Sequence, residues 1–278
     1  MDELGYHLNF RAEDSRVLAP DVAAQRRVAD VLHAVGEGYG LLAFRAAGDH
    51  LHVAAACDRT EAGKLARSVA GQLTQRLALP GFLPAHFTPC RDQRHLEEVF
   101  FYVLRNAEKH GVSNDPTHEA SSVGALLGMR VAPGPFLARV RRAVPALDRD
   151  LLLAIVGVRA LDPLVSLPLL ADAAAGAVGA VALDQSRLAT AARIAAVHLG
   201  LRTASPAAVA EALDMSERSI RRHREADADA FLLRAIGLRM GLRVALGDRA
   251  RVDLPVPTRR EWRRGRSALE ASARGDLG

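Results

Sequence analysis

The stretch LLAFRAAGDHLHVAAAC (41–57) decides the fold of the first part of the chain. Residues 41–45 and 50–57 are apolar enough to form strands, and the residues between them are typical of a turn. Because side chains alternate across a sheet, the second strand places His50, His52 and Ala54 on one face. The sequence therefore predicts an antiparallel hairpin that carries two imidazoles side by side.

The sequence on both sides of this hairpin predicts further strands and helices in alternation. The expected elements are a strand over 6–11, a helix that opens at Pro20 and Asp21 and runs to Val35, a helix over about 60–79, a strand within 82–90, and a helix from about 94 to 110 capped by Asp92. This β-α-β-β-α-β-α order with short gaps predicts an α+β fold, an antiparallel sheet with helices packed on it.

The composition changes at the Pro/Gly stretch VAPGP (131–135). Strand patterns stop there, and residues 137–243 are predicted to be nearly all helix. The tail beyond Asp248 is rich in Arg and Pro, which favours loose order. We therefore expect three parts: an α+β domain over 1–130, an all-α domain over 131–248, and an Arg-rich tail over 249–278.

Charge and cysteine content narrow the class of protein. A net charge of +5 and a pI of about 9.8 favour a polyanionic partner such as nucleic acid, although Arg-rich residue usage alone also gives this charge. Two cysteines are too few for a disulfide framework or a four-cysteine zinc site, so a cytoplasmic, nucleoid-associated location is expected.

The N-terminus lacks a signal-peptide pattern. The most apolar segment, 164–183, is rich in Ala and Gly and contains Asp172, so we expect a buried helix and no membrane partner.

The predicted helix LEEVFFYVLRNAEKHG (96–111) carries a second group of candidate residues. Its apolar stripe consists of Leu96, Val99, Phe100, Val103 and Ala107. Tyr102 lies beside this stripe, and Asn106 lies one turn later on the same face. Taken alone, Tyr102 is explained by a half-buried core position, and the two histidines by an exposed strand face.

Three segments in order resemble the HUH single-tyrosine transposases, and most closely their REP-associated group. The segments are GDHLHVAA (48–55), YVLRNAEKHGV (102–112) and HEASSVGALLG (118–128). The resemblance covers roughly residues 5–130 and implies a ferredoxin- or RRM-like HUH nuclease fold. It also implies that His50, His52 and Asn106 bind Mg²⁺ or Mn²⁺ and that Tyr102 is the nucleophile.

Several positions depart from the family pattern. Asp49 stands where Asn is common, Ala107 replaces a Pro, and the segment at His118 lacks the usual Trp. The stretch LPAHFTPCRDQ (83–93) is shorter than the basic and aromatic run of the family. This last departure concerns the grip on DNA and the choice of substrate more than the chemistry. All four implied site residues are present.

The residue types suit cleavage of a phosphodiester. A phenol with a pKa near 10 needs help to attack at neutral pH, and a divalent ion can polarise the scissile phosphate. Attack by Tyr102 would leave a 5′-phosphotyrosine and a free 3′-hydroxyl, and the reverse reaction would rejoin strands. The resemblance thus implies a metal-dependent single-stranded DNA endonuclease and strand-transferase acting at hairpins or palindromic repeats. Whether one chain or a homodimer forms the site stays open.

The second domain contains a candidate helix-turn-helix. Ser205-Pro206 and Ser216 are good helix starts, and Asp214 lies in the turn between the two helices. The pattern of Val209, Ala210, Leu213, Met215 and Ile220 resembles the helix-turn-helix of bacterial regulators, and residues 185–201 resemble the first helix of replication-initiator-like domains. The second helix is expected to run over 216–240. The residues expected to contact duplex DNA are Ser216, Arg218, Ser219, Arg221, Arg222 and Arg224.

Other functions remain open. The chain is alternatively a catalytically silent DNA-binding regulator derived from a transposase, or a protein with a structural metal site and no catalysis. The Arg-rich helix is alternatively a solvated face of a plain helical bundle. We expect His198 and His223 to serve packing or to lie on the surface rather than to bind metal.

Overall fold

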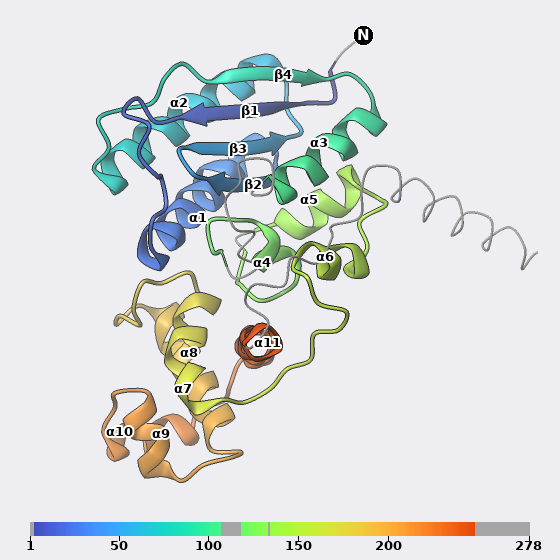
Figure 1. The fold of residues 1–278 in the computed structure, drawn as a ribbon. Coiled ribbons are helices and arrows are strands. Elements are labelled where there is room, and N and C mark those ends of the chain that lie inside the picture. Colours follow the sequence, from blue (N-terminus) through green and yellow to red (C-terminus); the bar gives the residue numbers. More distant parts are fainter. Residues whose placement is uncertain (1–2, 107–117, 133, 248–278) are drawn as a thin grey trace, which may run out of the picture.

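The computed structural model describes residues 3–106, 118–132 and 134–247. Figure 1 shows a sheet with helices on both faces, and a group of helices, α7 to α10, gathered at the other end of the molecule. The predicted tail over 249–278 and the helix residues predicted beyond Asn106, Ala107 among them, lie outside the described residues.

Four strands form one antiparallel sheet in the order β2-β3-β1-β4. Their bounds are Gly5–Arg11 (β1), Leu41–Ala47 (β2), His50–Ala55 (β3) and His86–Cys90 (β4). Pro89 is tolerated in β4 because β4 is an edge strand that pairs with β1 on one side only. The structure thereby confirms the predicted α+β class with an antiparallel sheet.

Three helices in this part begin at acidic N-caps. They are α1 (Val22–Gly36), α2 (Arg59–Leu77) and α3 (Gln93–Arg105), and η1 (Glu37–Tyr39) follows α1. The carboxylates of Asp21, Asp58 and Asp92 each accept a hydrogen bond from a backbone N–H of the first turn. The predicted starts of the first and third helices are therefore confirmed.

The helices cover opposite faces of the sheet. Phe44 of β2 contacts His33 of α1, whereas the guanidinium of its neighbour Arg45 donates to the carbonyl of Leu104 in α3. Because successive strand residues point to opposite faces, α1 and α3 lie on different sides. The α3 face is the one that carries the candidate histidines.

The third motif segment, residues 118–128, lies along the free edge of β2. The N–H of Ala46 donates to the carbonyl of Ala120, and the N–H of Ser122 donates to that of Phe44. A short helix, α4 (Val123–Leu126), follows. This segment protects an edge that would otherwise expose unpaired backbone groups.

The remaining described helices are α5 (Phe136–Ala143), α6 (Arg149–Ile155), α7 (Leu167–Ala177), α8 (Arg187–Gly200), α9 (Pro206–Ala212), α10 (Glu217–Arg224) and α11 (Ala230–Leu246). The single helix predicted over 216–240 is wrong, because α10 ends at Arg224 and α11 begins at Ala230. Asp229 marks the start of the second helix, since its side chain caps that helix by accepting from the N–H of Leu232. The apolar segment 164–183 contains α7, and no described helix is long and apolar enough to cross a membrane.

Two apolar cores hold the described chain together. The first core lies at the sheet and includes Phe136, Val140 and Leu161. It therefore extends past residue 130, where the sequence predicts the boundary between the two domains. The second is formed by α7 to α11. Helix α11 packs into both, with Leu238 in the first core and Ile236 in the second.

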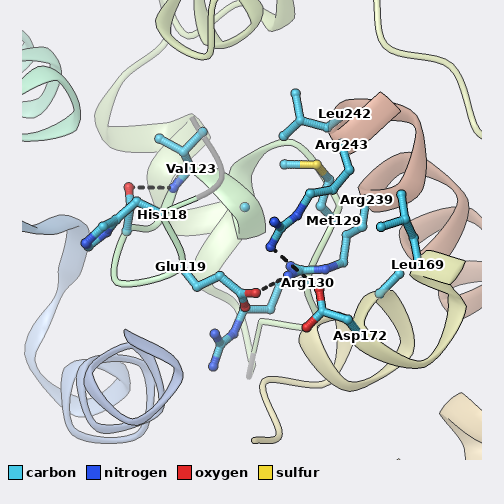
Figure 2. A pocket seen from close by; sticks show the side chains of 13 residues that line it. His118, Glu119, Val123, Met129, Arg130, Leu169, Asp172, Arg239, Leu242 and Arg243 are labelled. Carbon is cyan, nitrogen blue, oxygen red and sulfur yellow. Dashed lines mark hydrogen bonds and ion pairs between the residues drawn. The ribbon is translucent and has the colours of Figure 1, made fainter. Parts of the chain in front are cut away.

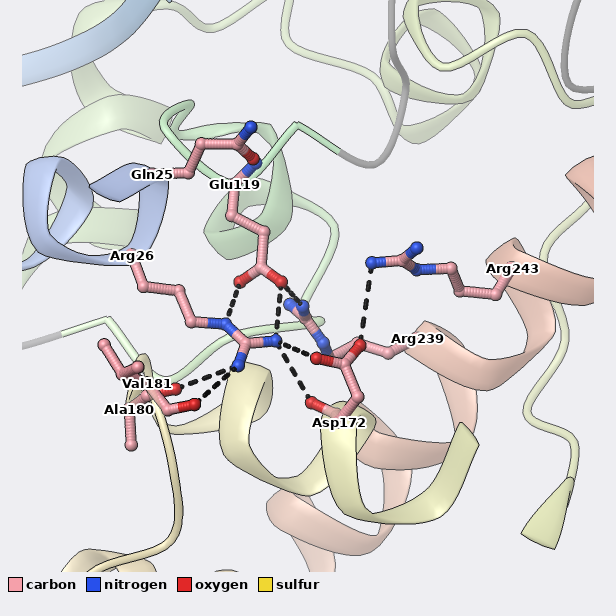
Figure 3. Close-up of polar contacts among 8 residues, drawn as sticks. All are labelled: Gln25, Arg26, Glu119, Asp172, Ala180, Val181, Arg239 and Arg243. Atoms are coloured by element: carbon pink, nitrogen blue, oxygen red, sulfur yellow. Dashed lines mark hydrogen bonds and ion pairs between the residues drawn. The ribbon is translucent and has the colours of Figure 1, made fainter. Parts of the chain in front are cut away.

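A buried ionic network joins the two parts (Figure 3). Arg26 of α1 donates two hydrogen bonds, of 3.0 and 2.9 Å, to the carboxylate of Glu119. The same guanidinium contacts Asp172 of α7, and Arg239 of α11 donates to Glu119. The carboxylate of Glu119 thus ties α1 to α11, and the guanidinium of Arg26 ties α1 to α7.

Candidate active site

The histidines lie on the sheet face that α3 covers. In the β1–β3 ladder Asn9 pairs with His52 and Arg11 pairs with His50, so these side chains share one face with His7. The His52 side chain is buried, and its ring stacks against that of His50 with centroids 6.1 Å apart. The two predicted imidazoles therefore do point the same way.

Tyr102 of α3 lies against this face. Its ring meets the His52 ring edge-on, with centroids 5.8 Å apart, and the His7 ring at 5.5 Å. Tyr102 is half-buried, which leaves part of the side chain accessible to a ligand. The structure thus brings a predicted imidazole and the predicted phenol together within one chain, from residues far apart in the sequence.

Asn106, the predicted third ligand, is the C-cap residue of α3. It is buried, and neither its amide oxygen nor its amide nitrogen has a hydrogen-bond partner among the described residues. A buried amide without partners costs about 1–3 kcal/mol, so it marks a place where a ligand would be stabilising. No hydrogen bond joins Asn106 to either histidine in the described part of the chain, and its place near Tyr102 follows from the one-turn spacing on α3.

Arg45 fixes the end of α3 that carries Asn106. Arg45 is buried, pairs with His52 in the β2–β3 ladder, and donates from Nη1 to the carbonyl of Leu104 at 2.9 Å. A cation at a helix C-terminus also offsets the partial negative charge of the last carbonyls. The sequence contains no signal for this role, because its pattern indicates only that Arg45 belongs to a strand.

Each candidate histidine has a close contact at Nδ1. His50 Nδ1 lies 2.5 Å from the carboxylate of Asp49. His52 Nδ1 lies 3.1 Å from Nε2 of His7. Desolvation raises the pKa of Asp49, but His50 and the hydrogen bond from Arg11 outweigh it and lower that pKa overall.

His7 is a site residue that the sequence analysis missed. A signal was present, since His7, Asn9 and Arg11 alternate with apolar residues along the strand, with the same two-residue spacing as His50 and His52. What the sequence lacked was the pairing register, which decides whether those side chains face the histidines of β3.

The donor set suits a divalent ion with oxygen-containing substrate ligands. Two imidazoles and one amide oxygen are neutral donors that Mn²⁺ accepts, and they leave coordination positions for phosphate oxygens and water. Within the described residues no group of three or more His, Cys, Asp or Glu side chains is arranged to hold a metal ion. A metal site would therefore depend on Asn106 as well as on the two histidines.

Two other features do not contribute to this site. Burial raises the pKa of the Cys57 thiol to about 12 and that of Cys90 to about 11, so neither is a reactive nucleophile. A pocket near the ionic network is lined by side chains of the third motif segment, of α7 and of α11, among them Arg239 and Arg243, and also by Arg130 (Figure 2). None of the predicted metal or nucleophile residues lines that pocket.

The predicted DNA-contacting residues lie on α10 and at its start. Arg218, Arg221, Arg222 and Arg224 are exposed, and Ile220 is buried against the second core. Ser216 is the N-cap, and its hydroxyl accepts from the N–H of Ser219 at 3.2 Å, so capping is one role of this serine. Asp214 has a φ of +50°, which places it in the left-handed region at the turn between α9 and α10.

The two histidines of this part serve packing. His198 contacts the carbonyl of Ala226, and the buried His223 contacts that of Ser219. Desolvation lowers the pKa of His223 despite that contact.

Comparison with known proteins gives no further identification, because no protein-family model, no curated protein and no solved structure matches this chain. The function must be argued from the residues and their geometry.

Proposed function

We propose that this protein is a metal-dependent endonuclease and strand-transferase for single-stranded DNA, with a 5′-phosphotyrosine intermediate formed on Tyr102. The observation that carries the proposal is the contact between the Tyr102 and His52 rings on one sheet face. A phenol beside an imidazole, with a buried amide one turn away that has no hydrogen-bond partner among the described residues, is an arrangement suited to a metal-assisted nucleophile.

His50, His52 and Asn106 would hold Mg²⁺ or Mn²⁺, and the bound ion would supply Lewis-acid polarisation of the scissile phosphate. The phenolate oxygen of Tyr102 then attacks phosphorus after its proton passes to water. A tyrosine–phosphorus bond forms, the bond from phosphorus to the 3′ oxygen breaks, and that oxygen takes up a proton. Attack on the phosphotyrosine by another 3′-hydroxyl reverses these steps and joins two strands.

The position of Tyr102 supports a site formed within one chain. Tyr102 already contacts His52 of the same chain, so a partner need not supply the nucleophile. A flexible single strand could reach a half-buried phenol on the sheet, whereas a duplex would first have to separate. Hairpins and palindromic repeats, which present single-stranded segments beside a duplex, are the substrates we propose.

A covalent-adduct assay tests the proposal. Full-length protein is incubated with a labelled single-stranded hairpin DNA and Mn²⁺, and the products are separated on a denaturing gel. We expect a labelled protein band that is absent with Tyr102→Phe, since this variant keeps the ring but loses the nucleophilic oxygen. Tyr39→Phe, at the half-buried Tyr39 of η1, is the matched control and should retain the band. An adduct that persists in Tyr102→Phe, or none with the unaltered protein, refutes the proposal.

A second candidate function is a catalytically silent regulator that binds duplex DNA. The observation that favours it is the set of four exposed arginines on α10, a short helix whose Ile220 is anchored in the core. Such a helix can present its cations to phosphates at a groove. In the preferred function the same surface would anchor the nuclease beside its single-stranded target.

A further inference from the structure

We infer that His7 is a positioning residue for the metal site: its Nε2 accepts a hydrogen bond from Nδ1–H of His52 and thereby holds the His52 tautomer whose Nε2 can bind the ion. The inference rests on the proposed function, because it assigns a role to His7 in the metal site of that function. It adds a residue that the motifs do not contain.

The contact between the two rings is direct. His7 Nε2 and His52 Nδ1 are 3.1 Å apart, within hydrogen-bond range, and the rings are nearly parallel with an interplanar angle of 17°. The strands that carry them are fixed by the core, since Leu8 of β1 and Val53 of β3 are fully buried on the other face. The relative position of the two imidazoles is therefore set by the sheet.

The chemistry of an imidazole decides the direction of this hydrogen bond. A neutral imidazole has one N–H and one acceptor nitrogen, and a metal ion binds the acceptor. If Nε2 of His52 is the metal ligand, the proton lies on Nδ1 and His7 must accept it. Metal-binding histidines generally donate their second ring N–H to a neighbouring acceptor, and His7 Nε2 has the position of that acceptor.

His50 shows the same orientation with a different partner. Its Nδ1 faces the carboxylate of Asp49, as the Nδ1 of His52 faces His7. Both imidazoles thus have a neighbour on the δ side, and the ε nitrogens of both rings would then bind the ion. Tyr102 contacts the His7 ring as well as the His52 ring, so His7 also borders the position of the nucleophile.

A nitrogen NMR measurement on the metal-free protein tests the tautomer directly. Long-range ¹H–¹⁵N correlation spectra of the histidine rings distinguish Nδ1–H from Nε2–H. We expect His52 to be the Nδ1–H form in the unaltered protein and to shift toward Nε2–H in His7→Ala. A His52 ring that carries its proton on Nε2 in the unaltered protein overturns the inference.

Mn²⁺ binding measured by calorimetry gives the second readout. His7→Ala should weaken Mn²⁺ binding by about 10- to 100-fold, the usual effect of losing an outer partner of a metal-binding histidine. His7→Gln, whose carboxamide oxygen can accept the same hydrogen bond, should recover most of the affinity. His86→Ala removes an exposed histidine of β4 and should change neither readout. Unchanged Mn²⁺ affinity in His7→Ala overturns the inference, and thermal melting verifies that each variant is folded.

The outcomes separate this inference from the proposed function. If the unaltered protein forms no DNA adduct but the tautomer and Mn²⁺ affinity respond to His7→Ala, the nuclease proposal fails and the positioning role stands. If the adduct forms and neither readout responds to His7→Ala, the nuclease proposal stands and the role of His7 is refuted.

Discussion

The buried residues His52 and His33 occupy two different chemical environments. His52 has a polar neighbour at Nδ1 and an aromatic ring beside it. His33 of α1 lies edge-on between the rings of Phe44 and Phe136, and neither of its nitrogens has a hydrogen-bond partner among the described residues. The first environment suits a ligand, whereas the second is an apolar core position that a histidine fills only in its neutral form.

The environment of His33 makes the fold sensitive to acid. Desolvation, with a smaller effect of Arg130, lowers the pKa of His33 from 6.5 to about 3. Between these values the unfolded chain binds a proton that the folded chain does not, so stability falls as the pH drops below 6.5. We expect His33 to cost about 1.4 kcal/mol of unfolding free energy on going from about pH 7.5 to about pH 5.5.

Urea denaturation of the unaltered protein and of His33→Leu at the two pH values measures this cost. Other titrating groups affect both proteins, so the difference between them isolates His33. The Leu variant should be the less acid-sensitive of the two by about the stated amount. Equal acid sensitivity of the two proteins would mean that His33 already binds a proton or has a partner in the fold.

At the scale of elements, much of this fold could be predicted from the sequence. The caps at Asp21 and Asp92 and the hairpin around Gly48 are local signals, and the structure confirms each of them. The helix predicted over 216–240 failed because Asp229 competes for the backbone of the next turn, a local effect that helical periodicity hides.

The candidate site could be predicted only in part. His50 and His52 lie on one strand and Tyr102 and Asn106 on one helix, so each pair follows from periodicity alone. His7 and Arg45 join the site through strand pairing and helix docking, which depend on contacts between residues about 45 and 59 positions apart. Such long-range contacts leave no periodic signal in a single sequence.

Helix α10 offers a prediction at the same scale. If Arg218, Arg221 and Arg222 contact phosphates, replacing all three by Ala should weaken duplex binding and flatten its salt dependence by about one unit of log–log slope per arginine. Fluorescence anisotropy with duplex DNA over a series of salt concentrations measures the slope. The control is Arg67→Ala, which removes an exposed arginine of α2 in the sheet part. A slope that is unchanged by the triple substitution would remove α10 from the DNA-binding surface.

At the scale of the whole molecule, the two parts are joined by apolar and ionic contacts together. Helix α11 packs into both cores, and its Arg239 fills the space beside Gly176 of α7, where a Cβ atom would overlap the guanidinium. Arg130 similarly occupies the space beside Gly179. The arginines at the junction therefore require these two glycines, so sequence changes at the junction are expected to be coupled.

Glu119 is the residue on which this junction depends, because its buried carboxylate accepts from both Arg26 and Arg239. Desolvation raises the pKa of Glu119, but Arg239 and Arg26 outweigh it and lower that pKa overall. The carboxylate therefore adds stability above its unfolded pKa of about 4.5, and this stability is lost as the pH falls through the lower folded value. We expect Glu119→Gln to lower the unfolding free energy by about 3 kcal/mol at neutral pH, since it leaves buried guanidinium charge without its counter-charge.

Chemical denaturation at neutral pH and again below about pH 4 measures this effect, and the difference between the two proteins should shrink at the lower pH as the carboxylate takes up its proton. The matched control is Asp172→Asn, which removes the other carboxylate that contacts Arg26. The Asp172 side chain is 45% exposed, so solvent screens its ion pairs and the loss should be about 1 kcal/mol or less. If the two substitutions cost the same, the junction is held by its apolar contacts through α11, and the buried carboxylate contributes no more than a surface charge.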